Sequence, residues 1–370
     1  MIYLDHNATT PLDQRVLEAM LPFLKTMYGN PSSTHRLGRI AKSAIEIARE
    51  QIAALIDAPS SNIIFTSGGT ESNNLAINLL SPTQTLAVST TEHPCIVEPA
   101  QRFQQKGGGL ELIEVNAKGE IEESSLMASL KKRPALVSIM LANNETGVIQ
   151  PIEKIADRIS EQGIFFHTDA VQALGKIPVS FQQLGVQMLS LSSHKIYGPK
   201  GCGALVVDKK IEINPLLLGG GQEKNDRSGT ENVAAIVGFG KAAELAATEL
   251  SERFHKMLQL RDLLESELTK IPRVTIFAKE SARLPNTTLF GVEGIDGELI
   301  LLKADQQGFA LSSGSACASQ EKEPSPILLA MGVAPQQART AIRVSLGYQN
   351  THEDILKLID FINHLTKFGV

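Results

Sequence analysis

The sequence predicts an α/β protein with a large domain, built on a mostly parallel central sheet, and a smaller α+β domain. In the first two thirds of the chain, short apolar runs alternate with amphipathic helical segments. This alternation is typical of a parallel sheet with helices on both faces. After about residue 231 a long helical stretch follows, and then strands and helices in irregular order.

In the large domain we expect strands where short apolar runs are bounded by polar or glycine-containing segments. These runs lie at residues 62–67, 85–90, 110–115, 135–142, 164–170, 188–193 and 203–208. Helices are predicted at 37–56, from about 70, from about 94, and near 122–131 and 151–162. The runs show little alternation with period 2, as expected for strands buried on both faces.

The last third of the chain predicts a long helix that ends near residue 270, followed by a smaller domain. Its strands are expected at 274–278, 286–292, 309–313 and 341–347, and its helices near 297–307, 324–331 and 352–367. We place the domain boundary inside the long helix. Residues 15–255 then form the large domain, and residues 1–14 and 256–370 form the small domain, which carries a cysteine loop at about 311–325.

The composition argues against several classes of protein. Cys95, Cys202 and Cys317 are too few, and odd in number, for a disulfide framework, and they fit a reducing compartment. A net charge of −5, with scattered lysines and arginines, argues against direct binding to nucleic acid. The first residues lack the features of a signal peptide, and no apolar run is long enough to span a bilayer. We therefore expect a cytoplasmic protein without a membrane partner.

Polar side chains directly follow several predicted strands. Ligands of parallel α/β sheets bind at the carboxyl ends of the strands, where such side chains can converge on one small molecule. The strand ends carry Ser67 to Glu71, Glu92 and His93, Asn143 to Glu145, Asp169 and Gln172, and Ser192 to Lys195.

The Gly68-Gly69-Thr70 turn leads into a predicted helix. Backbone N–H groups at a helix start, together with the helix dipole, suit a phosphate. A plain glycine turn with a threonine cap is the alternative. The motif is neither a Walker loop nor GxGxxG, so no nucleotide is implied.

Asp169 and Lys195 both follow apolar strands and raise the question of their partners. A partly buried carboxylate needs a cation, which is either an arginine or a protonated ring nitrogen of a cofactor. A desolvated lysine has a lowered pKa and forms Schiff bases with aldehydes. An aldehyde, a ring nitrogen and a phosphate together describe pyridoxal 5′-phosphate (PLP). His93 either stacks on its ring or is a surface histidine at a helix start.

Two residues of the small domain also carry candidate chemistry. Cys317 ends the small, polar segment SSGSAC and is predicted to be an exposed thiol, whereas Cys202 and Cys95 are expected in more apolar surroundings. Arg343 lies mid-strand among apolar residues, where its planar guanidinium favours a carboxylate. That carboxylate is either structural or part of a substrate.

Several motifs resemble those of cysteine desulfurases, PLP-dependent enzymes of the class V aminotransferase superfamily. They occur in the expected order from the first residues to at least Gly347: YLDHNATTP, GNPSSTHRLGR, FTSGGTESNNLAI, TEH, NNETGVIQPI, HTDAVQALGK, SSHKIYGPKGCGAL, GGGQE, RSGTENV, SSGSAC and IRVSLG. The resemblance implies the fold of PLP-dependent transferases of fold type I. SSGSAC resembles the group of desulfurases with a longer cysteine loop.

The resemblance also assigns roles to the candidate residues. PLP would form a Schiff base with Lys195, pair its ring nitrogen with Asp169, approach Gln172 with its ring hydroxyl, and stack on His93, which would also move protons. The phosphate would be held by Gly69, Thr70, Ser192 and His194, and by Thr230 of the neighbouring subunit in a homodimer. Arg343 and Asn143 would bind the substrate carboxylate, with Asn144 nearer the cofactor.

By the same resemblance the enzyme converts L-cysteine to L-alanine and forms a persulfide on Cys317, its nucleophile. The persulfide would pass to an acceptor protein of iron–sulfur cluster assembly, tRNA thiolation or DNA sulfur modification. After Gly347 the sequence holds about one helix, without the tail by which housekeeping members dock an iron–sulfur scaffold, so we expect another acceptor. Pro94 and Cys95 directly after His93 depart from the usual pattern, as does the charged ASQEKEPS after Cys317.

Other functions remain as alternatives at this point. A selenocysteine lyase or an aminotransferase of the same class would use the same cofactor, and Cys317 is the residue that discriminates them. A non-catalytic sulfur-relay protein on this fold would lack Lys195, Asp169 or Cys317, and all three are present.

Overall fold

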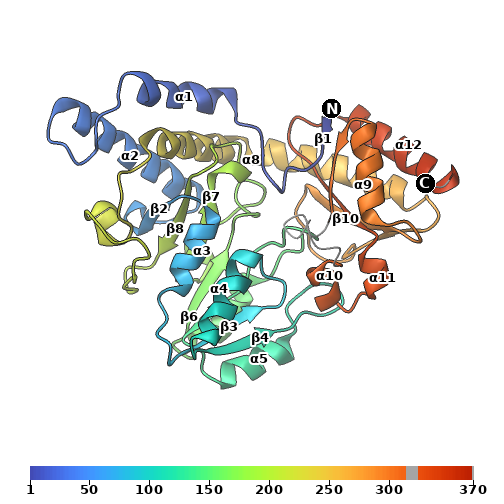
Figure 1. Cartoon of the computed structure of the whole chain (residues 1–370), viewed down its shortest axis with the longest axis horizontal. Coiled ribbons are helices and arrows are strands. Elements are labelled where there is room, and N and C mark those ends of the chain that lie inside the picture. Colours follow the sequence, from blue (N-terminus) through green and yellow to red (C-terminus); the bar gives the residue numbers. More distant parts are fainter. Residues whose placement is uncertain (314–323, 369–370) are drawn as a thin grey trace.

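The computed structural model describes residues 1–313 and 324–368, and it confirms an α/β fold with a mostly parallel central sheet (Figure 1). Cys317 lies outside the described residues. In the described part of the chain, no helix combines the length and the apolar character that a membrane span requires.

The central sheet has seven strands in the order β2-β8-β7-β6-β5-β3-β4. Their bounds are β2 (Ile63–Thr66), β3 (Thr85–Ser89), β4 (Gly109–Ile113), β5 (Leu136–Ser138), β6 (Phe165–Asp169), β7 (Met188–Ser192) and β8 (Gly203–Val207). Only β8 runs against its neighbours, since it pairs antiparallel with both β2 and β7. The carboxyl ends of β2, β3, β5, β6 and β7 therefore lie along one edge of the sheet.

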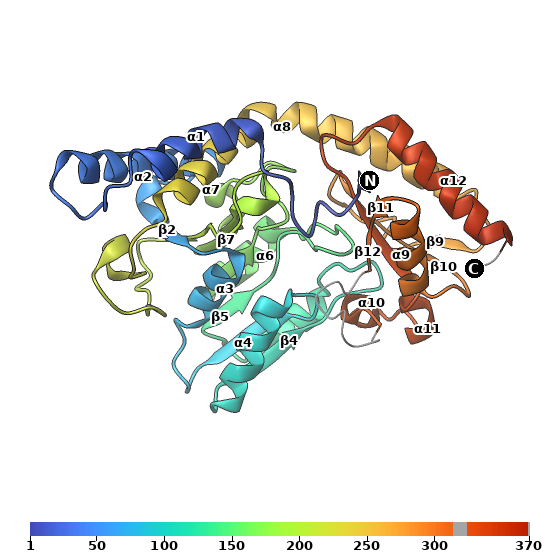
Figure 2. The ribbon, with the colours of Figure 1, turned by 45° about the horizontal axis from the view of Figure 1, so that its top comes forward.

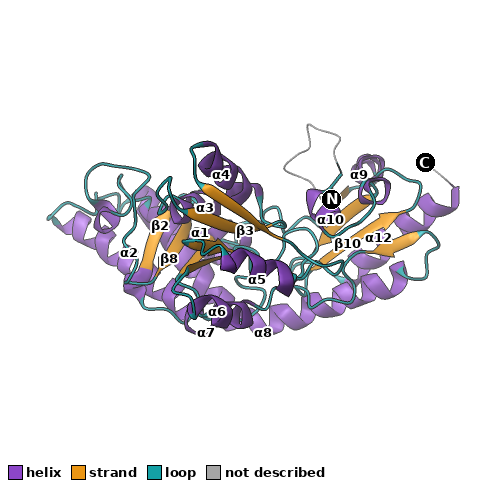
Figure 3. Cartoon of the chain, turned by 90° about the horizontal axis from the view of Figure 1, so that it is seen from below, coloured by secondary structure: helices purple, strands orange, loops and turns teal. Residues whose placement is uncertain are grey.

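Helices cover both faces of this sheet (Figure 3). One face carries α3 (Gly69–Ile77) and α4 (Pro94–Gln105), and the other carries α1 (Gln14–Lys25), α2 (Arg36–Leu55), α6 (Ile152–Ser160) and α7 (Phe181–Leu184), while α5 (Glu123–Lys131) follows β4. On α2, apolar residues at spacings of three and four form the buried stripe that the sequence predicts: Ala41, Ile45, Ala48 and Ile52. This stripe joins the core beneath the sheet.

The second sheet is antiparallel, in the order β12-β13-β10-β9. Its strands are β9 (Val274–Ile276), β10 (Thr287–Val292), β12 (Ser312–Ser313) and β13 (Ala341–Ser345), and β1 (Ile2–Tyr3) pairs beside it with β11 (Phe309–Ala310). Its helices are α9 (Gly297–Gln306), α10 (Pro326–Ala330), α11 (Pro335–Ala338) and α12 (His352–Phe368). The first residues of the chain thus lie with its last third. The exact domain boundaries stay a prediction.

Helix α8 (Val233–Leu268) runs along both sheets, as Figure 2 shows. Its first half contributes Phe239 and Ala243 to the core under the central sheet. Its second half contributes Leu260, Leu264 and Leu268 to the core of the second sheet. One continuous helix therefore connects the two cores.

Several elements differ from the sequence prediction: β1, α7 and α11 were not predicted, and the strand expected at 309–313 forms two strands, β11 and β12. The strand expected at 135–142 is shorter, because β5 ends at Ser138. The N–H groups of Ile139 and Leu141 still bond to β6, so the following apolar residues remain buried without forming a regular strand. Helix α1 was not predicted, and Pro22 within it interrupts the sequence signal.

Candidate active site

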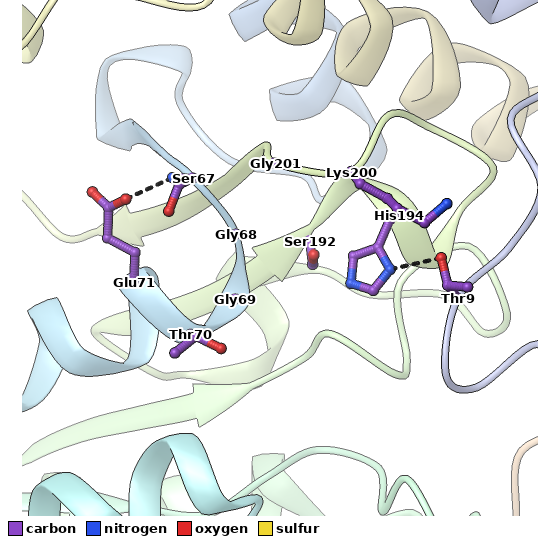
Figure 4. A pocket seen from close by; sticks show the side chains of 10 residues that line it. All are labelled: Thr9, Ser67, Gly68, Gly69, Thr70, Glu71, Ser192, His194, Lys200 and Gly201. Carbon is purple, nitrogen blue, oxygen red and sulfur yellow. Dashed lines mark hydrogen bonds between the residues drawn. The ribbon is translucent and has the colours of Figure 1, made fainter. Parts of the chain in front are cut away.

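A cavity of about 320 Å³ lies where β2 and β7 end (Figure 4). Its lining consists of Thr9, Ser67, Gly68, Gly69, Thr70, Glu71, Ser192, His194, Lys200 and Gly201. This lining includes all four residues that the sequence analysis expects one subunit to contribute to its phosphate site: Gly69, Thr70, Ser192 and His194. The sequence argument did not single out Thr9 or Lys200.

The glycine turn at the start of α3 gives this cavity its shape. Gly68 has a φ of +155°, which side-chain-bearing residues rarely adopt. A Cβ atom on Gly69 would lie only 2.8 Å from Cγ2 of Val171. Glycine at position 69 therefore lets the turn pack against Val171, and the first N–H groups of the nine-residue helix that follows lack partners within the helix.

The hydroxyl of Ser192 is buried and has no hydrogen-bond partner within residues 1–313 and 324–368. Such an unpaired group costs about 1–3 kcal/mol unless a ligand or water satisfies it. In Figure 4 the Ser192 side chain lies beside the Gly68-Gly69 turn. The cavity thus combines a helix N-terminus with an unsatisfied hydroxyl, which fits a phosphate.

The charged and titratable groups of the cavity are held in defined states. Burial would raise the pKa of Glu71, but hydrogen bonds from Arg227, 2.8 Å away, and from Ser67 hold it below its usual value. Burial, with Lys195 and other nearby cations, lowers the pKa of His194 to about 4. His194 is therefore neutral at pH 7, with Nδ1 3.1 Å from Oγ1 of Thr9.

Lys195 ends a short 3₁₀ turn (Ser193–Lys195) that directly follows β7. Its side chain is half-buried, and Nζ donates hydrogen bonds to the carbonyl oxygens of Asn7 (2.5 Å) and Ala8 (2.8 Å). The N-terminal segment therefore fixes the position of the amine that the sequence predicts to carry the cofactor.

Asp169 is the last residue of β6 and is buried. Its Oδ2 atom accepts a hydrogen bond from the Asn73 amide at 2.6 Å, and Oδ1 accepts one from the Val171 N–H at 2.9 Å. These donors are neutral groups rather than the arginine considered as one alternative. A carboxylate held in this way can still pair with a cationic ring nitrogen.

His93 is the N-cap of α4, so it is indeed a histidine at a helix start. It is also part of the site, because the charges of Asp169 and Lys195 both act on it. Burial is the main cause that lowers the pKa of His93, Lys195 lowers it further, and Asp169 opposes the change. His93, Asp169 and Lys195 therefore lie close enough to interact electrostatically.

The structure commits the Asn143 side chain to hydrogen bonds within its own part of the chain. Its Oδ1 atom accepts hydrogen bonds from the N–H groups of Glu145 and Thr146, and its amide nitrogen donates to the Thr91 carbonyl. The buried Asn143 side chain is thus committed to shaping its own turn and has little capacity left for a substrate. Asn144 is half-buried instead, and its carbonyl oxygen lies 2.9 Å from Nη1 of Arg343.

Arg343 has the structural carboxylate that was one of its two expected partners. Its Nη2 atom lies 2.7 Å from Oδ1 of Asp5, in an ion pair in which the arginine is 3% exposed. Its Nε atom is buried and has no hydrogen-bond partner within the described chain. Arg343 therefore keeps an unused donor despite its pairing with Asp5.

A buried lysine that the sequence analysis missed lies behind this site. Lys176 donates to Oδ1 of Asn7 at 3.0 Å and to Oε1 of Gln172 at 2.7 Å, and Gln172 donates to the Asn7 carbonyl. Burial, with the charges of Lys195 and Arg343, holds the pKa of Lys176 well below its usual value. The signal was present, since this lysine follows the largely apolar stretch that begins at Ala170.

Two predicted site residues lie outside this arrangement. Thr230 is exposed and does not line the cavity, and Cys317 falls outside the described residues. Cys202 is buried as expected, and Cys95 is half-buried, with Asn73 and His93 as hydrogen-bond partners.

The strand ends of this mostly parallel sheet carry a cavity suited to a phosphate, a lysine and a carboxylate. This arrangement is typical of PLP-dependent enzymes of fold type I. The aminotransferase class-V family model matches residues 2–358. A cysteine desulfurase IscS of Dictyoglomus turgidum is 45% identical, with 98% of this chain and 94% of that protein covered. The chain belongs to the class-V aminotransferases and, among them, to the PLP-dependent cysteine desulfurases.

Solved structures agree with this assignment. A NifS-like protein superposes with a TM-score of 0.93 at 36% identity, and 99% of each chain is covered. The structure of SspA in complex with cysteine has a TM-score of 0.84 at 33% identity, with 95% of this chain and all of that chain covered.

Proposed function

We propose that this cysteine desulfurase holds PLP through Lys195 and Asp169 and receives the sulfur of L-cysteine on Cys317. The observation that carries the proposal is the cavity with the unpaired Ser192 hydroxyl and the α3 N-terminus, beside the strand ends that bear Lys195 and Asp169.

The residues present fit the cofactor. The N–H groups that follow Gly68, together with Thr70, Ser192 and His194, would bind its phosphate, and neutral His194 would act as a hydrogen-bonding group. Asp169 would face the ring nitrogen and Lys195 the aldehyde carbon. When bound, PLP supplies an electron sink for negative charge at the α-carbon of an amino acid.

The protein supplies binding and proton transfer around this electron sink. Lys195 would move the proton of the substrate α-carbon. The carbonyl oxygens of Asn7 and Ala8 accept hydrogen bonds from Nζ and orient the amine during this step.

The substrate carboxylate would bind to Arg343. Asp5 orients the guanidinium, and the unpaired Nε atom offers a further donor. Asn144, whose backbone carbonyl contacts Arg343, would also lie near this carboxylate. A charge-assisted hydrogen bond from the guanidinium would orient the amino acid in the site.

Sulfur leaves the substrate in one balanced step. The Cys317 thiolate attacks the substrate sulfur, the carbon–sulfur bond breaks, and the β-carbon receives a proton. Cys317 then carries a persulfide, the two sulfur atoms are formally oxidised, and the β-carbon is reduced in the released L-alanine. Because the oxidation of the two sulfur atoms balances the reduction of the β-carbon, persulfide formation needs no further oxidant or reductant. The persulfide sulfur then passes to an acceptor protein.

A homodimer in which Thr230 reaches the neighbouring cofactor phosphate is part of this proposal. Thr230 is exposed, and the same loop region displays Leu216, Leu217 and Leu218, of which Leu218 is 84% exposed. Arg227, three residues before Thr230, holds Glu71 at the cavity of its own subunit. The loop region therefore contacts the cavity of its own subunit through the Arg227–Glu71 ion pair and exposes an apolar surface that a second copy can cover.

The decisive experiment compares Cys317→Ala with Cys202→Ala, measuring alanine production from L-cysteine and the absorbance of bound PLP. We expect Cys317→Ala to abolish alanine production while the PLP absorbance remains, and Cys202→Ala to retain both. Lys195→Ala should lose the absorbance of the covalently bound cofactor. Full activity of Cys317→Ala would show that another group accepts the sulfur.

A further inference from the structure

Cys95, one of the residues that departs from the family pattern, lies against His93. Its Sγ atom is 2.9 Å from Nδ1 of His93, and its backbone N–H donates to the same Nδ1 atom at 3.1 Å. A ring nitrogen that accepts a backbone N–H cannot carry a proton of its own. The neutral ring of His93 must therefore carry its proton on Nε2.

The direction of the thiol hydrogen bond follows from this tautomer. Because Nδ1 is an acceptor, the sulfur of Cys95 must donate its proton to it. The thiol is available for this purpose, since burial, helped by the charge of Asp169, raises the pKa of Cys95 to about 12. A thiolate–imidazolium pair is disfavoured, because burial also lowers the pKa of His93.

Asn73 connects this pair to the carboxylate of the site. Its amide nitrogen donates one hydrogen to Oδ2 of Asp169 at 2.6 Å and the other to Sγ of Cys95 at 3.0 Å. The amide orientation is set by Asp169, since an amide oxygen in that place would face the carboxylate oxygen. The Cys95 sulfur thus accepts a hydrogen bond from Asn73 and donates its own proton to Nδ1 of His93.

We propose that Asn73 and Cys95 are positioning residues that hold His93 as the neutral tautomer protonated on Nε2. His93 then enters the reaction as an uncharged ring that can stack on the cofactor and donate a hydrogen bond through Nε2. Its Nδ1 atom is occupied and takes no part in proton transfer. This inference rests on the proposed role of His93 at the cofactor, and it replaces a proton-shuttling role with a hydrogen-bonding one.

The test uses nitrogen-15 NMR of histidine rings in the PLP-loaded enzyme, because the chemical shifts of Nδ1 and Nε2 distinguish the tautomers. His93→Gln identifies the resonances of His93. We expect a neutral ring with the proton on Nε2 in the wild type, a weaker bias in Cys95→Ala, and restoration in Cys95→Ser, whose hydroxyl can also donate.

Activity provides the second readout. Loss of one hydrogen bond predicts a 2- to 10-fold lower kcat for Cys95→Ala, with KM nearly unchanged and recovery in Cys95→Ser. Cys202→Ala, which removes a thiol from the core, should leave kcat and the His93 resonances unchanged. A proton on Nδ1 in the wild type, or Cys95→Ser matching Cys95→Ala in both measurements, overturns the inference. If the wild type shows the expected tautomer but His93→Gln is fully active, only the proposed role of His93 at the cofactor is rejected.

Discussion

The two ends of the candidate site are built differently. At the phosphate end, the rim residues Ser67 and Thr70 are exposed, and the buried hydroxyl of Ser192 has no partner in the described chain. At the ring end, both oxygens of Asp169 already accept hydrogen bonds, and Nδ1 of His93 is occupied by Cys95. One end presents unused donors to a ligand, whereas the other is organised by the protein itself.

This difference predicts which kinetic parameter each end controls. Unused donors gain their partners only when the ligand binds, so changes there should weaken binding. Groups that the protein has already oriented need no reorganisation during the reaction, and such preorganised electrostatics mainly stabilises the transition state. Changes at the ring end should therefore lower kcat. The following variants test this contrast.

The largest effect is expected for Asp169→Ala at the ring end. Removing the negative charge that is proposed to pair with the ring nitrogen should lower kcat about 10²- to 10³-fold, a loss typical of removing a preorganised electrostatic contact. Asp262→Ala is a suitable control, because Asp262 is an exposed partner of Arg261 outside the site. Steady-state assays of alanine production with saturating PLP measure the effect. A loss below threefold would contradict the assigned role of Asp169.

A second variant, at Glu145, measures how the burial of a carboxyl group near Arg343 affects the stability of the fold. Glu145 is buried and accepts a hydrogen bond from Ser325 at 2.5 Å, and burial raises its pKa to about 7, while Ser325 and Arg343 oppose the shift. Because the folded state holds this proton more tightly, the protein loses stability as pH rises from about 4.5 to about 7. The loss from this one group amounts to about 3 kcal/mol.

Glu145→Gln removes the titrating group and preserves the shape of the side chain. We expect the free energy of unfolding of the wild type, relative to this variant, to fall by up to that amount between pH 4 and pH 8. Urea denaturation at both pH values measures it. If the difference between the two proteins is independent of pH, Glu145 is ionised in the folded protein or its pKa is not raised.

The smallest effect is expected at the phosphate end. Ser192→Ala should weaken PLP retention about tenfold, as expected for one hydrogen bond to a charged group, and leave kcat unchanged at saturating PLP. Ser193→Ala is a matched control, since its hydroxyl is also buried without a partner in the described chain but does not line the cavity. Cofactor titration by absorbance distinguishes them. Equal PLP affinity in both variants would show that Ser192 does not contact the phosphate.

Much of the site could be predicted because its residues occupy strand ends. The runs before Asp169 and Ser192 are apolar enough to mark β6 and β7, and parallel strands place their carboxyl ends along one edge. The composition of the Gly68-Gly69 turn predicts the start of a helix. These local signals account for Gly69, Thr70, Ser192 and His194 meeting in one cavity.

The roles of the two asparagines could not be predicted in the same way. Asn143 and Asn144 are identical in type and adjacent in sequence, and only their hydrogen bonds show that Asn143 shapes its turn. Likewise, Asp5 meets Arg343 across 338 positions of the chain, a distance at which the sequence carries no local signal.

The sequence by itself determined the alternation of strands and helices, the motif order and the chemistry available at each strand end, because these depend on periodicity and on residue type. Only the tertiary structure decided which groups face one another. Asn7 is brought to Lys195 and Lys176 by the N-terminal segment, and Asn73 is brought to Asp169 by the packing of α3 against the sheet. Hydrogen bonds between distant segments depend on distance and direction, and these are fixed only when the whole chain has packed.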